Sequence, residues 1–325
     1  MLHFAADAHC DLLSYLQGVP NASPFAEESR CSLTQLQQGG VALQTMAIFT
    51  TTQPGSVQAG AQQANHFLQL LTRYPDKVYT PTCAEHLQNV LREPRIALVA
   101  AIENASSFCL ENEPLQNGFQ QLDKLEHQLG KIFYISLTHH TENRFGGGNY
   151  TNIGLKEDGK RLLDYLANKR IAIDFSHASD ALAYGILEHI DKNHLPLKVI
   201  ASHSNFRAVH HHRRNLPDDI AKAIIQRGGI IGLTWLKAYV GNQPTDLLRH
   251  WQHGKRLGAA MVCGADLFYY QPKDFPSGVY FERYSNASNF LMLKEDMENF
   301  GVQKDDLSNF FTTNLISFLK NLWFN

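Results

Sequence analysis

The sequence has 325 residues, of which 44% are hydrophobic and 18% charged, and its formal net charge is −2. This composition is typical of a globular protein with a large core, and the lack of a basic surplus argues against an electrostatic nucleic-acid binder. No apolar run reaches the roughly 20 residues that cross a bilayer. We therefore expect neither a nucleic-acid nor a membrane partner.

Short β-like runs alternate with helical stretches along the chain. We predict strands at eight places, residues 2–8, 41–49, 96–102, 132–137, 171–175, 198–201, 229–234 and 259–263. Helical patterns follow most of them, at residues 58–73, 115–129, 158–168, 179–191, 218–226, 245–256 and 286–299, and a last helix covers residues 306–322. This order predicts an α/β fold of the (β/α)8 TIM-barrel type, with the last helices closing its outside.

A doubly wound open sheet would show a similar alternation of strands and helices. The strand count and the absence of a Gly-x-Gly-x-x-Gly turn after the first strand favour the barrel. No repeat or linker divides the sequence, so we predict one domain over residues 1–325. The N-terminus lacks the pattern of a secretory signal and the five cysteines are odd in number and scattered, so we expect reduced thiols and a cytoplasmic protein.

Six of the eight predicted strands end near a side chain that can bind a metal. These side chains are His9 and Asp11 after the first strand, then Glu103, His139, His177, His203 and Asp266 at later strand ends. In a barrel the carboxyl ends of the strands converge on one face, so these groups would meet there. Imidazoles and carboxylates are typical zinc ligands, and Glu103 at the end of an apolar strand is the candidate bridge between two ions. Each residue alone is more often structural, but together they indicate a metal site.

Other polar residues fit structural roles better. Three consecutive histidines at 210–212 cannot all face one ion, so we interpret them as part of a solvated loop. Cys10 lies between two candidate ligands, and its side chain should point away from them into the core. Asp174 is a candidate hydrogen-bond partner for a ligand histidine.

The candidate ligands stand in motifs that resemble those of the membrane dipeptidase (renal dipeptidase) family, the M19 metallopeptidases of the amidohydrolase-like superfamily. Residues 7–12 (Asp-Ala-His-Cys-Asp-Leu) resemble its opening Asp-x-His-x-Asp, residues 136–139 its Leu-Thr-His, and residues 173–177 its Ile-Asp-Leu-Ser-His. The longest match is Ala-Ser-His-Ser at 201–204 with Arg-Arg-Asn-Leu-Pro-Asp-Asp at 213–219. Gly-Ala-Asp at 264–266 and Asn-Leu at 314–315 complete the series, so the resemblance runs nearly the full length.

The resemblance implies a metal-dependent hydrolase barrel that binds two zinc ions. One ion would be held by His9, Asp11 and Glu103, and the other by Glu103, His177 and His203. The family's pattern further implies that His139 contacts the substrate near the reacting carbonyl, that Arg214 binds the substrate carboxylate, that Asp266 lies beside the nucleophilic water, and, on a looser match, that Tyr239 contacts the substrate.

The implied activity is hydrolysis of small dipeptides by a hydroxide that bridges the two metals. A barrel hydrolase of the same kind acting on another amide, an N-acyl amino acid or a lactone is the alternative. A non-catalytic scaffold is disfavoured because every expected ligand is present. The sequence leaves the oligomeric state open, with a homodimer as one candidate.

The sequence departs from the family pattern at two places. Members commonly carry a second acid two residues after the last aspartate, where this chain has Phe268, so we expect a different loop shape and substrate preference. Asn104 follows Glu103 where glycine is usual. Related barrels bridge their metals with a carboxylated lysine, but Lys131 starts its strand and would face the wrong end, which favours Glu103 as the bridge.

Overall fold

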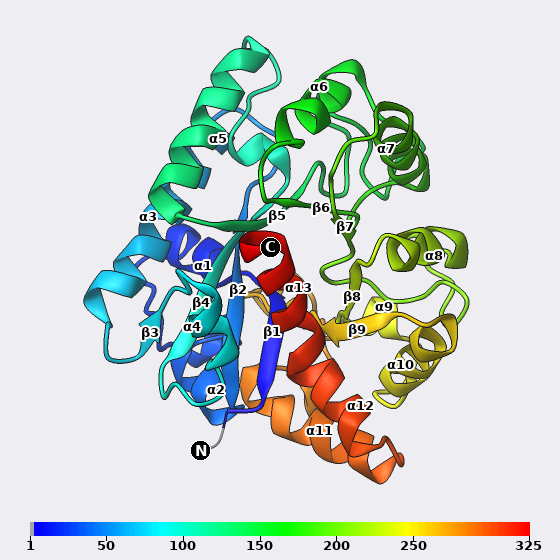
Figure 1. Ribbon diagram of the computed structural model, residues 1–325. Helices are drawn as coiled ribbons and strands as arrows, with labels where there is room; N and C mark the ends of the chain where they lie inside the picture. The colour runs from blue at the N-terminus through cyan, green and yellow to red at the C-terminus, as the bar shows by residue number, and fades with distance from the viewer. Residues whose placement is uncertain (1–2) are drawn as a thin grey trace.

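The computed structural model describes residues 3–325, and its central feature is a ring of eight parallel strands (Figure 1). They are β1 (Ala5–Cys10), β2 (Val41–Phe49), β4 (Ile96–Glu103), β5 (Ile132–Ser136), β6 (Ala172–Asp174), β7 (Val199–Ile200), β8 (Ile230–Leu233) and β9 (Ala260–Cys263). They pair in the order β7-β6-β5-β4-β2-β1-β9-β8. Ala201 closes the ring between β7 and β8, since its amide donates to the Ile230 carbonyl (3.0 Å) and its carbonyl accepts from the Gly232 amide (2.7 Å). The predicted (β/α)8 barrel is confirmed.

Thirteen α-helices surround or cap the ring within residues 3–325. They are α1 (Leu12–Gly18), α2 (Leu33–Gln38), α3 (Ser56–Arg73), α4 (Ala84–Gln88), α5 (Leu115–Leu129), α6 (Glu157–Leu166), α7 (Asp180–Asn193), α8 (Asp218–Gln226), α9 (Lys237–Val240), α10 (Asp246–Leu257), α11 (Phe290–Asn299), α12 (Lys304–Ser308) and α13 (Asn314–Phe324). The sequence did not predict α1, α2, α4 and α9, because helices of four to seven residues are too short to show a helical period. The two-residue strand β3 (Val78–Tyr79), which pairs with β4, was missed for the same reason.

The first strand differs from its predicted position. We expected residues 2–8, of which residue 2 lies outside the described part of the chain, whereas β1 covers Ala5–Cys10. His9 therefore belongs to the strand itself rather than to the loop after it. The backbone of His9 is also hydrogen-bonded to the segment after β9, because the His9 carbonyl accepts from the Asp266 amide at 3.2 Å.

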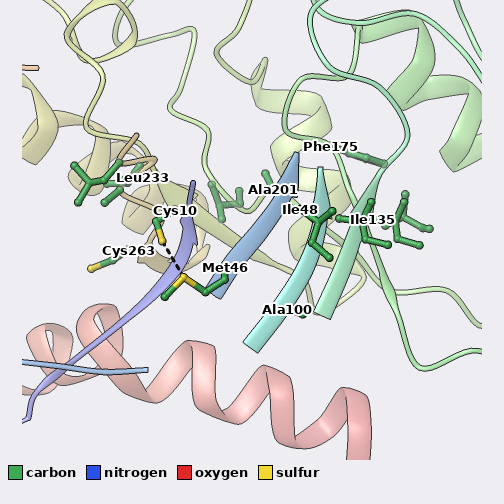
Figure 2. Close-up of a cluster of buried hydrophobic side chains, with 14 of the residues drawn as sticks. Cys10, Met46, Ile48, Ala100, Ile135, Phe175, Ala201, Leu233 and Cys263 are labelled. Carbon is green, nitrogen blue, oxygen red and sulfur yellow. Dashed lines mark hydrogen bonds between the residues drawn. The ribbon is translucent and has the colours of Figure 1, made fainter. Parts of the chain in front are cut away.

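Alternate residues of the strands pack in two separate layers. On β4, Leu98, Ala100 and Ile102 belong to the large cluster that also contains the buried side chains of the surrounding helices. Figure 2 shows part of this outer layer, where the Cys10 thiol lies 3.5 Å from the Met46 sulfur. Cys10 thus packs in the core, as predicted, and all five cysteines are free thiols. The other face of β4 points into the barrel, and Glu103 continues that inner face.

The C-terminal helix α13 lies across the centre of the ring of strands (Figure 1). Its buried face packs on inward-pointing strand residues, and many of these are alanines: Ala6, Ala8, Ala42, Ala97, Ala101 and Ala172. Phe318 and Trp323 of α13 lie 6.0 and 6.5 Å from the Phe133 ring of β5. The prediction that this helix closes the outside of the barrel is therefore wrong. The helix covers the amino end of the barrel, where Trp323 contacts Lys131 before β5 and Arg170 before β6, and its large apolar side chains join the buried cluster of these small residues.

None of the helices within residues 3–325 combines the length and the hydrophobicity that crossing a membrane requires.

Candidate metal centre

The five predicted ligands meet at the carboxyl end of the barrel. His9 lies in β1, Asp11 caps α1, Glu103 ends β4, and His177 and His203 follow β6 and β7. All five are buried, with exposed fractions between 0% and 8%. Parallel strands bring residues from four separate parts of the sequence to one point, as the strand-end pattern predicted.

Glu103 stands between two groups of side chains. Its Oε2 atom lies 3.5 Å from His9 Nε2, which in turn lies 3.5 Å from Asp11 Oδ2. Its Oε1 atom lies 2.8 Å from His177 Nε2 and 3.5 Å from His203 Nε2. Because each carboxylate oxygen faces a different group, Glu103 has the geometry of a bridging ligand.

The donor set fits two divalent ions. Ligand-type atoms of His9, Asp11 and Glu103 lie within 4.8 Å of one another, and so do those of Glu103, His177 and His203. His9 Nε2 and Asp11 Oδ1 are buried and have no hydrogen-bond partner among residues 3–325. A buried polar atom without a partner costs free energy, and a cation between these atoms would remove that cost.

The electrostatics of the cluster also favour a cation. Burial lowers the pKa of His9, but Glu103 and Asp11 outweigh that effect and raise it to about 10. Burial raises the pKa of Glu103 well above its usual value and that of Asp266 to about 6. The carboxylates of Asp11, Glu103 and Asp266 therefore lie close together in a buried site, and a bound cation would offset their mutual repulsion.

The histidines of the second group are neutral. Burial lowers the pKa of His177 and of His203 well below the usual value, and the positive charge of Arg214 contributes to both shifts. A neutral imidazole keeps the lone pair that metal binding requires.

Each histidine among the candidate ligands has a partner on its second ring nitrogen. His9 Nδ1 lies 2.6 Å from the Tyr134 hydroxyl of β5. His203 Nδ1 lies 2.7 Å from Ser202 Oγ, which donates to Asp174 Oδ2 at 2.8 Å. Asp174 thus reaches a ligand histidine through one intervening hydroxyl. Such partners fix the orientation and the tautomer of a metal-binding imidazole.

The third candidate ligand, His177, contacts a residue that the sequence did not single out. His177 Nδ1 lies 3.4 Å from His140 Nδ1, and that nitrogen is 2.9 Å from Asn149 Oδ1. The His140 ring stacks on Tyr150 with centroids 4.4 Å apart. His140 directly follows a predicted site residue, and this adjacency was the only signal that could have identified it. Tyr134 could have been identified from the sequence more readily than His140, because a buried tyrosine on an inward strand face needs a hydrogen-bond partner.

Backbone strain is concentrated at the same strand ends. Asn104, His177 and Asp266 have φ angles of 71°, 69° and 60°, a region that side-chain-bearing residues rarely adopt. The φ angle of Asn104 explains why glycine suits this position, and asparagine tolerates it better than most residues. Its Nδ2 also donates to the Thr50 carbonyl at 2.8 Å, which holds the turn.

The remaining predicted site residues surround the cluster. Asp266 Oδ1 lies 3.8 Å from His9 Nε2, and His139 Nε2 lies 3.9 Å from Glu103 Oε1. Arg214 is buried and donates to Ser204 Oγ at 2.7 Å and to the His203 carbonyl at 3.0 Å, while its Nε has no partner among the described residues. Its guanidinium lies 5.7 Å from the centroid of the Tyr239 ring. Arg214 thus lies beside the site, next to His203 and Tyr239.

The cluster opens into a cavity of about 900 Å³. Asp11, Glu103, His139, His177, Tyr239 and Asp266 line it, together with residues that the sequence did not single out: Phe49, His140, Tyr150, Phe268, Tyr269 and Phe275. His210 and His212 also line the cavity, and the His212 ring lies 4.8 Å from that of Tyr239. His210 and His212 are half-buried and His211 is exposed, and among the described residues none of the three belongs to a group of potential ligands, which agrees with the interpretation of 210–212 as a solvated loop.

A family model described as membrane dipeptidase (peptidase family M19) matches residues 3–321. The chain belongs to this family. The M19 chain is 27% identical over 216 residues to dipeptidase verJ of Clonostachys rogersoniana, an alignment that covers 62% of this chain and 51% of that protein. The chain spans about half the length of the curated relatives it matches.

Solved structures of metallo peptidases share the fold. A metallo peptidase of Rhodobacter sphaeroides, liganded with a phosphinate mimic of the dipeptide L-Ala-D-Ala, superposes with a TM-score of 0.83 at 18% identity and covers 99% of this chain and 100% of that one. A second structure, described as dipeptidase AC, a metallo peptidase of family M19, has a TM-score of 0.81 at 19% identity and covers 99% of both chains. At these identities the similarity establishes the barrel and not the substrate.

Proposed function

We propose that this M19 chain is a zinc-dependent dipeptidase with a binuclear centre. The observation that supports this most directly is the placement of Glu103, whose two oxygens face separate groups of ligand side chains. In the proposal, His9, Asp11 and Glu103 hold one ion, and Glu103, His177 and His203 hold the other. Two ions bound there would polarise a carbonyl group and lower the pKa of a water molecule between them.

The neighbouring side chains supply proton transfer and charge stabilisation. Asp266, whose pKa burial raises to about 6, can accept the proton of the attacking water and pass it to the departing amine. Burial lowers the pKa of His139 well below its usual value, so its imidazole is neutral and can donate one hydrogen bond to the developing oxyanion.

The charge distribution around the centre matches a zwitterionic dipeptide. The carboxylates of Asp11 and Asp266 lie on the His9 side, and the Arg214 guanidinium lies on the side of His203 and Tyr239. A substrate would place its ammonium group toward the acids and its carboxylate toward Arg214. The Rhodobacter sphaeroides relative binds a mimic of a dipeptide, which supports the same class of ligand here.

The test is hydrolysis of a broad panel of L,L and L,D dipeptides by the purified chain with two equivalents of zinc. We expect cleavage of free dipeptides, and metal analysis should give two ions per chain. Substitution of the proposed bridging residue, Glu103→Ala, should abolish both dipeptide cleavage and the binding of two ions. Intact dipeptides throughout the panel, from protein that holds two zinc ions, would overturn the proposal.

A further inference from the structure

A second cavity adjoins the metal centre on the acidic side. It measures about 280 Å³, which is larger than any single amino-acid side chain. Asp11, Ser14, Phe268 and Tyr269 line both this chamber and the main cavity, so the two spaces are neighbours at these residues. The remaining walls come from the end of α1 and from the loop after β9: Tyr15, Gly18, Val19, Pro20 and Gln271.

The walls of the chamber are mostly apolar. The rings of Tyr15 and Tyr269 pack with centroids 5.3 Å apart. The Tyr15 hydroxyl is already engaged, because it donates to Glu28 Oε1 at 2.7 Å. Among the described residues that line the chamber, Asp11 is the one charged side chain and no lysine or arginine is present. Such walls suit an apolar group, and they offer no positive charge that could pair with an anionic one.

The junction between the two cavities carries the polar groups that would hold a substrate ammonium. Asp11 contributes a carboxylate, and Asp266 lies on the same side of His9. Ser14 Oγ is buried there with no hydrogen-bond partner among residues 3–325, so it is free to accept a hydrogen bond. An ammonium group at this junction would point the side chain of its own residue toward the chamber.

We propose that the chamber receives the side chain of the N-terminal residue of the dipeptide. The preferred substrates are therefore dipeptides with a bulky, uncharged, apolar N-terminal residue, such as Phe or Trp. This inference rests on the proposed dipeptidase function and adds the substrate class to it. Phe268 stands where other family members commonly have an acid, and it supplies one wall of the chamber.

Gly18 provides a direct test, because it lies on the chamber wall and a Cβ atom built on it meets nothing within 4 Å. Leucine at this exposed position would add an apolar side chain at the edge of the chamber without a steric clash. The matched control is Gln17→Leu, which adds the same side chain to the neighbouring exposed position outside the chamber wall. If Gly18→Leu lowers the thermal midpoint of unfolding, Gly18→Ala can be used instead, because it adds only a methyl group.

The experiment measures kcat/KM of the zinc-loaded wild-type chain for Ala-Ala, Phe-Ala, Trp-Ala, Ala-Phe, Glu-Ala and Lys-Ala. We expect at least a tenfold preference for Phe-Ala and Trp-Ala over Glu-Ala and Lys-Ala. Gly18→Leu should lower the Phe-Ala to Ala-Ala ratio at least fivefold, Gly18→Ala should lower it less, and Gln17→Leu should leave it unchanged.

Any other result contradicts either the proposed dipeptidase function or the assignment of the chamber. If none of the dipeptides is cleaved, the proposed function itself fails. If they are cleaved without regard to the N-terminal side chain, or if neither Gly18 variant changes the ratio, the chamber assignment fails while the dipeptidase function stands. A loss confined to Ala-Phe in Gly18→Leu would show that the chamber receives the C-terminal side chain, and would overturn the inference as stated.

Discussion

The hydroxyl of Tyr134 lies 2.6 Å from His9 Nδ1 and 3.2 Å from the Ala8 carbonyl oxygen. Because a carbonyl can only accept, the single hydroxyl proton goes to Ala8, and the hydroxyl oxygen accepts from His9 Nδ1. His9 Nε2 is then the ring nitrogen that faces Glu103 and Asp11. Tyr134 thus sets which nitrogen of His9 is available as a ligand.

Tyr134→Phe removes this hydrogen bond and keeps the ring. We expect the affinity for the ion held by His9 to fall about 10- to 100-fold, as is usual when the partner of a ligand histidine is lost. Competition with a chromogenic chelator measures the affinity. Tyr284→Phe is the control, since its hydroxyl donates to Asp296 away from the site. Equal zinc affinity in Tyr134→Phe and wild type would show that Tyr134 has no such role.

Arg214→Lys keeps the positive charge but loses the planar fork that binds a carboxylate at two points. We expect the ratio of kcat/KM for a dipeptide over its C-terminal amide to fall roughly 10- to 100-fold, the effect of one charge-assisted hydrogen bond. The neighbouring Arg213→Lys should leave this ratio unchanged, because Arg213 binds Thr151 and Asn152 at the surface. If Arg214→Lys lowers kcat/KM equally for the dipeptide and for its C-terminal amide, Arg214 has only a structural role.

Metal removal should destabilise the fold. Without cations, Asp11, Glu103 and Asp266 are left as buried acids that repel one another. Free metal at a hundredfold excess over its Kd stabilises the native state by about 3 kcal/mol, so a chelator should lower the thermal midpoint and added zinc should restore it. The thermal midpoint of the Glu103→Ala variant should change much less when a chelator or zinc is added. A wild-type midpoint that chelation leaves unchanged would contradict a metal-supported site.

His250 should make stability depend on pH. Its Nδ1 accepts from the Phe206 amide at 3.1 Å and its Nε2 donates to the Val240 carbonyl at 2.9 Å, while burial lowers its pKa from 6.5 to about 4. Below pH 6.5 the unfolded chain takes up a proton that the native chain does not, so stability falls as the pH drops toward 4.

The loss amounts to roughly 3 kcal/mol between pH 7 and pH 4. His250→Gln can keep both hydrogen bonds but does not titrate, so its unfolding free energy should fall less over this range. Urea denaturation at several pH values measures the difference, and the exposed His211→Gln serves as the control. If His250→Gln follows the wild-type pH profile, this account of His250 is incorrect.

The sequence predicted that these candidate side chains meet because their positions depend on a local rule. Each ligand stands at the end of an apolar strand, and parallel strands in a barrel bring these ends together. The partners of the ligands do not follow from such a rule. Tyr134 is 125 residues from His9, and His140 is 37 residues from His177, so only the folded chain shows these contacts.

The position of α13 could not be predicted for a related reason. The spacing of Leu315, Phe318 and Leu319 predicts one apolar face, and that face suits either the outside of the barrel or its end. The alanines of four different strands make room for the helix, and their joint effect appears only when the ring is closed.

The placement of α13 also bears on how the protein is made. The inner layer of the barrel is completed by residues 314–324, more than 300 residues after β1. During synthesis, β1 leaves the ribosome more than 300 residues before α13. The contacts that join α13 to the inner layer can therefore form only after residues 314–324 have been made, so this part of the core depends on pairing between distant parts of the chain.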